Sequence, residues 1–208
     1  MEREERAQVG LLALESGKDV LLEKPMTATL EQADDLMVAA AARGAILQVG
    51  HIERYNAAII KLQEFLTHPG FIESHRLGPY DPRVRDVGVV LDLMIHDIDI
   101  VLNLVRSPIV SIDAVGVPIL SQREDIANAR IRFENGCTAN LTVSRVTPNR
   151  MRKIRIFQAN TYVSIDYQKQ SMEIYRRTQI ENADEGEPAA QIVRKRLRLK
   201  KEEPLKRE

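Results

Sequence analysis

The 208-residue chain has few of the features that mark secreted, membrane or nucleic-acid-binding proteins. Its single cysteine, Cys137, excludes an internal disulfide and is typical of a reducing compartment. No apolar run approaches the ~20 residues that a membrane-spanning helix needs, and residues 1–6 contain no apolar segment of a secretory signal. Lys+Arg and Asp+Glu are equal at 30 each, so no net charge favours nucleic acid or anionic membranes. These absences predict a cytoplasmic protein with neither membrane insertion nor a nucleic-acid partner.

The first 52 residues alternate helix and strand. Thr29 and Gln32 stand three residues apart, as in a capping box, and Gly17 and Gly44 follow helical patterns as left-handed caps do. The two apolar strand segments between these signals are short and continuous, as in a buried parallel sheet. We therefore predict helices over 4–16 and 30–43, strands over 19–22 and 45–49, and a βαβ crossover.

The remainder of the chain is dominated by strands. A helix over 55–67, a strand over 71–77 and a very apolar helix over 89–105 precede them. Alternating residues then predict strands over 109–117, 127–134, 137–146, 151–158, 161–167 and 171–178. Asn135-Gly136 is typical of a tight hairpin turn. This succession predicts an antiparallel sheet with one face covered by the preceding helices.

The last stretch is strongly charged. Residues 181–190 are acidic and rich in turn formers, and residues 194–201 are basic. We interpret them as an exposed loop and an edge strand whose charges oppose aggregation. A nucleic-acid-binding arm is disfavoured, because no aromatic residue lies among the basic ones.

One further absence concerns the phosphate-binding motif of dinucleotide folds. Those folds place G-x-G-x-x-G in their first strand-to-helix turn, where backbone N–H groups meet the pyrophosphate. The sequence has no such string, and its first glycines, Gly10 and Gly17, lie within and after a helix. Either the first unit is not a dinucleotide domain, or the front half of that domain is not part of this chain. The second interpretation is favoured by the motifs below.

A polar stripe crosses the apolar helix predicted over 89–105. Its residues, at spacings of four, three and four, are Asp92, His96, Asp99 and Asn103, whereas Asp97 points elsewhere. At about 100° per residue the four fall within roughly a 60° arc. A thin solvated stripe is an equal interpretation on spacing alone, but the stripe lacks the Lys, Arg, Glu and Gln of exposed helical faces. Short acids beside a histidine tune its pKa and tautomer, as a general base or acid requires. A metal site is disfavoured, since no other His or Cys stands at metal-ligand spacing.

A second candidate is Glu23-Lys24-Pro25, directly after the first buried strand. The carboxyl ends of strands line the ligand crevice of open α/β sheets. Lys24 can there place its ammonium beside a substrate hydroxyl or a cofactor ribose. An ordinary loop lysine is the alternative.

A third candidate, residues 50–56, follows the next strand at the same sheet edge. His51, Arg54 and Tyr55 are polar residues that can face the same crevice. Alternatively the segment only begins a helix, with Glu53 or Asn56 satisfying backbone donors.

Two arginines of the following loop, Arg83 and Arg85, are candidates for a phosphate contact. Forked guanidinium hydrogen bonds suit phosphates. Solvated loop charges are the alternative interpretation.

Three motifs in order carry a family resemblance. They are Gly-Lys-Asp-Val-Leu-Leu-Glu-Lys-Pro at 17–25, Val-Gly-His at 49–51 and Asp-x-x-x-His-Asp at 92–97. Together they are far more specific than any one alone. The chain resembles the Gfo/Idh/MocA oxidoreductases, named for glucose-fructose oxidoreductase and inositol dehydrogenase, over most of its length.

The resemblance implies an α/β enzyme in two parts. Residues 1–52 would be a truncated dinucleotide-binding domain, the C-terminal part of a Rossmann-like parallel sheet. Residues 53–208 would be a substrate-binding and oligomerisation domain, an α+β domain with a large, mostly antiparallel open sheet. The chain would lack the N-terminal half of the Rossmann domain and the family's final C-terminal helix.

The resemblance also implies the roles of the candidate residues. The catalytic set maps onto Lys24, Asp92 and His96, and the cofactor, NAD or NADP, onto Glu23, Lys24, Pro25 and His51. The substrate, a sugar or nucleotide sugar, maps onto Arg54, Tyr55, Arg83 and Arg85. No metal is implied, and a homo-oligomer, dimer or tetramer, is expected.

Within the family, three segments most resemble bacterial UDP-N-acetylglucosamine 3-dehydrogenases, which prepare amino-substituted sugars for lipid A. These segments are residues 51–56, 86–99 and 127–137. The implied reaction is hydride transfer from C3 of UDP-N-acetylglucosamine to nicotinamide. This chain would be a fragment of the enzyme, and the fragment alone is expected to be inactive. Two alternatives stay open: oxidation of inositol or another sugar, and a non-catalytic sugar-binding or assembly module.

Overall fold

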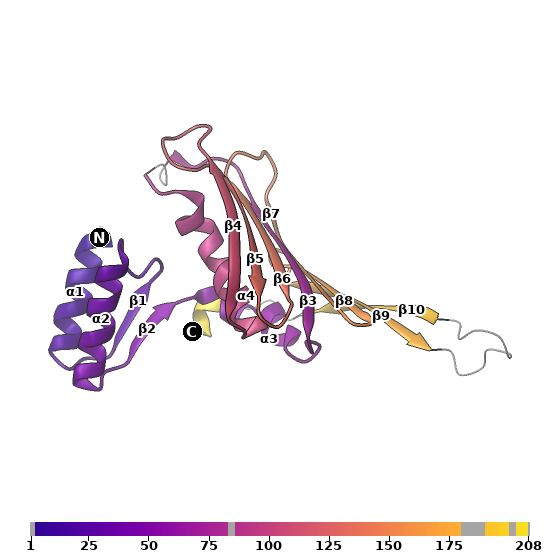
Figure 1. Cartoon of the computed structure of the whole chain (residues 1–208), viewed down its shortest axis with the longest axis horizontal. Coiled ribbons are helices and arrows are strands. Elements are labelled where there is room, and N and C mark those ends of the chain that lie inside the picture. Colours follow the sequence, from indigo (N-terminus) through magenta and orange to yellow (C-terminus); the bar gives the residue numbers. More distant parts are fainter. Residues whose placement is uncertain (1–2, 83–85, 180–189, 200–202, 208) are drawn as a thin grey trace. The chain divides into compact units, whose positions relative to one another are not determined.

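The computed structural model describes residues 3–82, 86–179, 190–199 and 203–207. Its contacts divide the chain into two units, Met1–Ile52 and Glu53–Arg207 (Figure 1). Among the described residues, no helix has the length and apolar character needed to cross a membrane.

The first unit consists of two helices and a two-stranded parallel sheet. Its elements are α1 (Arg3–Glu15), β1 (Val20–Glu23), α2 (Leu30–Arg43) and β2 (Leu47–Gly50). The two helices lie side by side in Figure 1 and share a core of Leu14, Leu22, Leu36 and Ala40 with the sheet. A Cβ at Gly10 of α1 would lie 3.3 Å from methyl carbons of both Leu22 and Leu36. The glycine therefore allows α1 to pack closely on its neighbours.

The ends of α2 are as predicted. The Gln32 backbone N–H donates to Thr29 Oγ1 over 3.3 Å, and the Thr29 N–H donates to Gln32 Oε1 over 3.3 Å. Gly44 ends the helix in the left-handed region, at φ 61°. The capping box and the glycine cap thus fix where the chain passes from β1 into α2 and on to β2.

The second unit is built on one eight-stranded sheet. Before the sheet's main part come η1 (Ile52–Tyr55), α3 (Ala57–Leu62), β3 (Pro69–Leu77), η3 (Val90–Met94) and α4 (Ile95–Val105). The later strands are β4 (Ile109–Val117), β5 (Ile126–Phe133), β6 (Thr138–Ser144), β7 (Met151–Gln158), β8 (Thr161–Asp166), β9 (Ser171–Gln179) and β10 (Ala190–Arg198), followed by the short η4 (Pro204–Lys206). The strand order is β10-β9-β8-β7-β3-β6-β5-β4, with only the β3–β6 pair parallel among these described strands. The predicted fold class, a parallel α/β unit followed by a large, mostly antiparallel sheet, is confirmed.

The core of this unit lies between the sheet and its helices. Alternate residues of the strands point inward, among them Ile72, Leu141, Ile154 and Ile165, and pack with Ile59 of α3 and Ile100 of α4. The predicted hairpin joins β5 and β6, with Gly136 at φ 85°. Asn135 Oδ1 accepts from the Cys137 N–H over 3.1 Å, so both residues of the Asn-Gly turn have local structural roles.

Two predicted helices differ from those observed. The helix expected over 55–67 is a 3₁₀ turn followed by the short α3, because the Asn56 side chain accepts from the Ala58 N–H over 3.0 Å and begins the helix there. Beyond Leu62 the chain makes tighter turns toward β3, which starts at Pro69; a proline disfavours helical geometry in the residue before it.

The apolar helix expected over 89–105 is not regular either. Its first part, Val90–Met94, is a π-helical turn in which the Ile95 N–H donates to the Val90 carbonyl. The ordinary α-helix begins only at Ile95. The rotation of 100° per residue therefore does not hold between Asp92 and His96.

The face of the sheet opposite the helices carries an aromatic ladder. Directly paired residues of four neighbouring strands form it: Phe71, Phe157, Tyr162 and Tyr175. Their ring centroids are 5.7, 4.9 and 5.4 Å apart, and the Arg194 guanidinium of β10 lies over Tyr175. The edge strand β10 is rich in Arg and Lys, as predicted for the basic stretch near the C-terminus, whereas the acidic stretch lies almost wholly outside the described residues.

Candidate active site

In the first unit, the predicted cofactor-binding residues follow the carboxyl ends of the two strands. Glu23 pairs with Gly50 in the parallel register, so Lys24 and His51 leave the sheet at the same edge. Lys24 and Pro25, joined by a cis peptide bond, and His51 are all partly buried. This edge is where open α/β sheets bind their ligands.

The segment around Lys24 is held by a residue that the sequence did not single out. Arg6 of α1 donates through Nη1 to the Glu23 carbonyl over 2.9 Å and to the Pro25 carbonyl over 3.3 Å. Both carbonyls adjoin Lys24 in the chain, so Arg6 fixes the backbone on which that side chain is carried.

In the second unit, Asp92 lies in the π-helical turn and lines a cavity of about 190 Å³. Further lining residues come from β3, β6, β7 and the loops beside them, and include Arg76, Pro79, Asp81, Arg145, Arg150 and Arg152. The pocket therefore combines carboxylates, which accept from hydroxyl groups, with guanidinium donors. His96 follows one turn later in α4 and is partly buried.

The other two residues of the predicted polar stripe, Asp99 and Asn103, have different surroundings. Asp99 accepts a hydrogen bond from Arg54 Nε over 2.8 Å, and this bond raises the pKa of Arg54. Asn103 lines a separate cavity of about 340 Å³ together with Gln63 and Arg106. Neither residue is among the described lining of the Asp92 pocket, so a shared role for the four stripe residues stays a prediction.

The structure describes two of the four predicted substrate-binding residues, Arg54 and Tyr55. The Arg54 side chain is half-exposed and its guanidinium is engaged by Asp99. Tyr55 ends η1 and is partly buried. Arg83 and Arg85 lie outside the described residues. A substrate contact by any of the four stays a prediction.

A buried polar network that the sequence analysis missed lies next to the pocket. Arg76 of β3 donates to Asp97 through Nε over 2.9 Å and to Glu53 through Nη1 over 3.0 Å. Ser74 Oγ donates to Asp97 Oδ1 over 3.0 Å, and Arg76 lies 5.7 Å from the Tyr167 ring. Burial alone would lower the pKa of Arg76, but the charges of Asp97 and Glu53 outweigh it and raise that pKa. The network connects η1, β3 and α4, and thus holds the helix that carries His96.

The signal for this network is present in the sequence. Arg76 and Ser74 share the strand face of the core residue Ile72, at alternate positions. A charged residue at an inward position of a strand requires a buried partner, and Asp97 of the Asp-x-x-x-His-Asp motif is that partner.

A second buried pair organises the other side of the pocket. Arg145 donates through Nε to Asp125 Oδ1 over 2.6 Å, through Nη2 to Ser121 Oγ over 2.8 Å and through Nη1 to the Val87 carbonyl over 2.6 Å. Burial would raise the pKa of Asp125, but hydrogen bonds from three backbone N–H groups, beginning with that of Ile119, and from Arg145 hold it well below the usual range. The pair ties the loop after β4 to the segment before η3.

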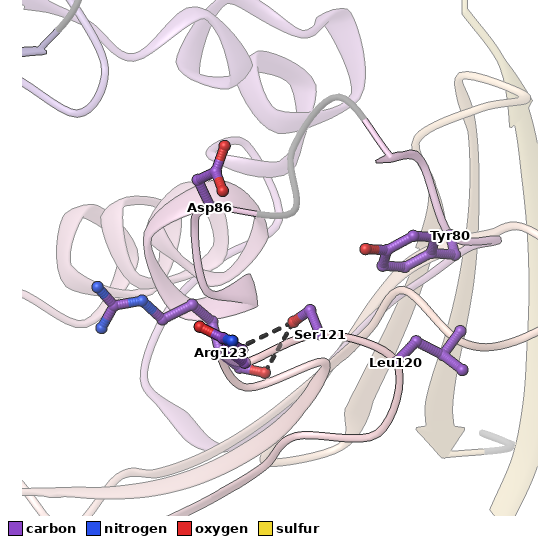
Figure 2. A pocket seen from close by; sticks show the side chains of 6 residues that line it. Tyr80, Asp86, Leu120, Ser121 and Arg123 are labelled. Atoms are coloured by element: carbon purple, nitrogen blue, oxygen red, sulfur yellow. Dashed lines mark hydrogen bonds between the residues drawn. The ribbon is translucent and has the colours of Figure 1, made fainter.

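A larger cavity of about 580 Å³ adjoins this second pair. Figure 2 shows Tyr80 and Leu120 on one side of it and Asp86 and Arg123 on the other, with Ser121 between them. The Arg145 guanidinium lies 5.6 Å from the Tyr80 ring, so Arg145, which lines the smaller pocket, also contacts the wall of the larger one. Among the described residues, no three His, Cys, Asp or Glu side chains gather in a way that suits a metal ion.

Comparison with known families accounts for both units. Residues 3–51 match the family model described as "Oxidoreductase family, NAD-binding Rossmann fold". Residues 68–165 match the model of the GFO/IDH/MocA C-terminal domain. The chain belongs to the Gfo/Idh/MocA oxidoreductase family. The predicted family resemblance is confirmed, and so is the predicted NAD-binding Rossmann-like fold.

Individual members of the Gfo/Idh/MocA family show how much of a whole protein the chain covers. It is 39% identical over 170 residues to UDP-N-acetylglucosamine 3-dehydrogenase of Acidithiobacillus ferrooxidans, covering 81% of this chain and 54% of that protein. It is 27% identical over 151 residues to scyllo-inositol 2-dehydrogenase (NAD(+)) of Bacillus subtilis, covering 65% of this chain and 44% of that protein. The chain therefore spans about half the length of these curated relatives.

A solved structure gives the same result for the fold. UDP-N-acetylglucosamine 3-dehydrogenase GnnA from Acidithiobacillus ferrooxidans superimposes with a TM-score of 0.88 at 33% sequence identity. The match covers 99% of this chain and 64% of that structure's chain.

Proposed function

We propose that the protein is an NAD(P)-dependent dehydrogenase that oxidises a sugar hydroxyl, at C3 of UDP-N-acetylglucosamine. The observation that carries this proposal is the pocket that Asp92 lines, in which carboxylates and guanidinium groups meet. Such a lining suits a ligand with several hydroxyl groups. The 39% identity to a UDP-N-acetylglucosamine 3-dehydrogenase supports the choice of substrate.

The residues of the first unit fit a nicotinamide dinucleotide. Glu23, Lys24, Pro25 and His51 lie at the carboxyl edge of a parallel sheet, where such folds bind dinucleotides. We assign them to the cofactor, NAD or NADP, and we assign Lys24 to the catalytic set as well. When bound, the cofactor supplies the hydride acceptor.

Side chains of the protein then accept the hydroxyl proton and stabilise the negative charge that develops on the hydroxyl oxygen. His96 takes the proton of the C3 hydroxyl as the C–H bond gives up its hydride, and a ketone forms. Asp92 orients His96, and Lys24 donates a hydrogen bond to the same oxygen to stabilise its developing negative charge. The buried Asp97–Arg76 pair keeps the helix of His96 in place.

The test is turnover by the full-length protein, which here means this chain joined to the N-terminal half of the Rossmann domain that the family resemblance implies. NAD and NADP reduction is followed with UDP-N-acetylglucosamine, and Lys24→Ala and His96→Ala are each expected to lower kcat by about 10²- to 10⁴-fold, as loss of acid–base or charge stabilisation does. Lys18→Ala and His68→Ala, at exposed positions, are matched controls expected to change little. Undiminished turnover in the Lys24 and His96 variants would refute the assignment.

A second substrate class has an observation in its favour. The 27% identity to a scyllo-inositol dehydrogenase favours a neutral cyclic polyol. Profiling scyllo-inositol beside UDP-N-acetylglucosamine decides between the two: a kcat/KM higher by tenfold or more for inositol would replace the nucleotide sugar as the substrate.

The second unit is also proposed to mediate assembly. Together, residues 53–208 would bind the substrate and form a homo-oligomer, dimer or tetramer. The partly exposed aromatic ladder on the open sheet face supports such a role. Light scattering of Tyr162→Lys against wild type tests it, with a shift toward monomer expected.

A further inference from the structure

Among the described residues, four arginines line the pocket beside Asp92, and they differ in how their charge is balanced. Arg76 is paired with Asp97 and Glu53, and Arg145 is paired with Asp125. Both are buried, with 4% and 3% of their side chains exposed, and their hydrogen-bonding groups are directed at these carboxylates and at Ser121 and Val87. These two arginines are therefore structural.

The side chains of the other two, Arg150 and Arg152, make no hydrogen bond or ion pair within the described parts of the chain. Arg152 stands directly opposite Arg76 in the β3–β7 pairing and is half-buried. Burial and then the positive charge of Arg76 lower the pKa of Arg152, and the negative charges of Glu53 and Asp97 offset this only in part. The fold thus holds a guanidinium where its charge is disfavoured, and an anion in the pocket would offset that cost.

The remaining lining of the pocket indicates what kind of anion fits. Asp81 and Asp92 line the same pocket, so a purely anionic ligand would meet two carboxylates. A molecule with both hydroxyl groups and a phosphate suits this mixture: hydroxyls donate to carboxylates, and phosphate oxygens accept from guanidinium groups.

We propose that Arg150 and Arg152 bind the diphosphate of a nucleotide-sugar substrate, and so select phosphorylated over neutral sugars. This inference rests on the proposed function. It places the phosphate contact on Arg150 and Arg152 rather than on Arg54, a predicted substrate residue whose guanidinium is paired with Asp99. Arg152 comes from the strand next to Arg76, so it is placed by the sheet rather than by a loop.

The experiment measures UDP binding and sugar oxidation in the full-length protein. Isothermal titration with UDP is expected to show about 10- to 100-fold weaker binding in Arg152→Met and in Arg150→Met, the usual effect of losing a charge-assisted hydrogen bond. Arg152→Lys should recover part of the loss. Lys153→Gln removes one positive charge from the adjacent residue of β7, on the opposite face of the sheet, and should bind UDP as wild type does.

Several outcomes would overturn the inference. One is UDP affinity within twofold of wild type in a folded Arg152→Met protein. The same affinity in Arg150→Met would also overturn it, and this variant is expected to fold because Arg150 is exposed. Another is a loss confined to NADP and absent for UDP, which would assign the arginines to a cofactor phosphate.

The proposed function fails by a different result. If the protein oxidises scyllo-inositol and not UDP-N-acetylglucosamine, the nucleotide-sugar activity is wrong. If UDP binding still depends on Arg152, the phosphate site is supported even though the proposed activity is wrong. If UDP binding does not depend on Arg152, the phosphate site is refuted as well.

Discussion

Arg76 of β3 and Asp97 of α4 form an ion pair inside the second unit, with 2.9 Å between Nε and Oδ2. Only 4% and 1% of the two side chains are exposed. The pair joins the strand at the centre of the sheet to the helix that carries His96. Buried pairs of this kind cost much to break, because removal of one partner leaves the other charge buried alone.

Asp97→Asn is expected to destabilise the second unit by about 3 kcal/mol, since Arg76 then keeps only Glu53 as a charged partner. Urea unfolding measures the change. Asp113→Asn, on the fully exposed strand β4, is the control and should change stability by less than about 0.5 kcal/mol. The double variant Arg76→Met/Asp97→Leu should recover much of the loss; equal stability of Asp97→Asn and Asp113→Asn would contradict the role of the pair.

Asp125 should make the protein sensitive to acid. Its folded pKa is held well below the usual range, so its stabilising contribution is complete above the unfolded pKa of about 4 and declines as the pH falls below it. Unfolding free energy measured from pH 6 to pH 2 should fall less steeply in Asp125→Asn than in wild type. Parallel curves for the two proteins would show that Asp125 does not contribute.

Cys137 should react slowly in the folded protein. Burial raises the pKa of its thiol to about 11, and the thiolate is the reactive form. At pH 8, alkylation by iodoacetamide is expected to be at least about 100-fold slower in native protein than in urea-unfolded protein. A native rate close to the unfolded rate would mean that the thiol is not buried.

Thr29→Ala should loosen the start of α2. It removes the hydroxyl that accepts from the Gln32 N–H, at an expected cost of about 1 kcal/mol. Hydrogen exchange of the first-turn amides of α2 should accelerate accordingly, and Thr29→Ser, which keeps the oxygen, should restore protection. Unchanged exchange in Thr29→Ala would show that the capping box is energetically unimportant.

Most of the local structure follows from short-range chemistry. The capping box at Thr29 and Gln32, the left-handed Gly44 and the Asn135-Gly136 turn act within a few residues, so their sequence is sufficient to predict them. The helix predicted over 55–67 failed because the boundary depended on which of several polar residues capped it, and Asn56 did so.

The candidate site was less predictable. Asp92 and His96 were found from residue type and spacing, but the arc calculated for the stripe assumed a regular helix, and the π-helical turn breaks that assumption. Arg152 gave no signal, since its meaning depends on the strand beside it, β3, which lies far away in the sequence.

The sequence by itself determined the fold class, the family and the positions of Lys24, Asp92 and His96 in their motifs, because periodicity and motifs are properties of neighbouring residues. Only the tertiary structure decided which charges are neutralised: Arg76 by Asp97, Arg145 by Asp125 and Arg54 by Asp99, with Arg152 left facing the pocket. These pairings join residues 20 to 45 positions apart. At such separations the distance between two charges is set by how strands and helices pack, and no local pattern records it.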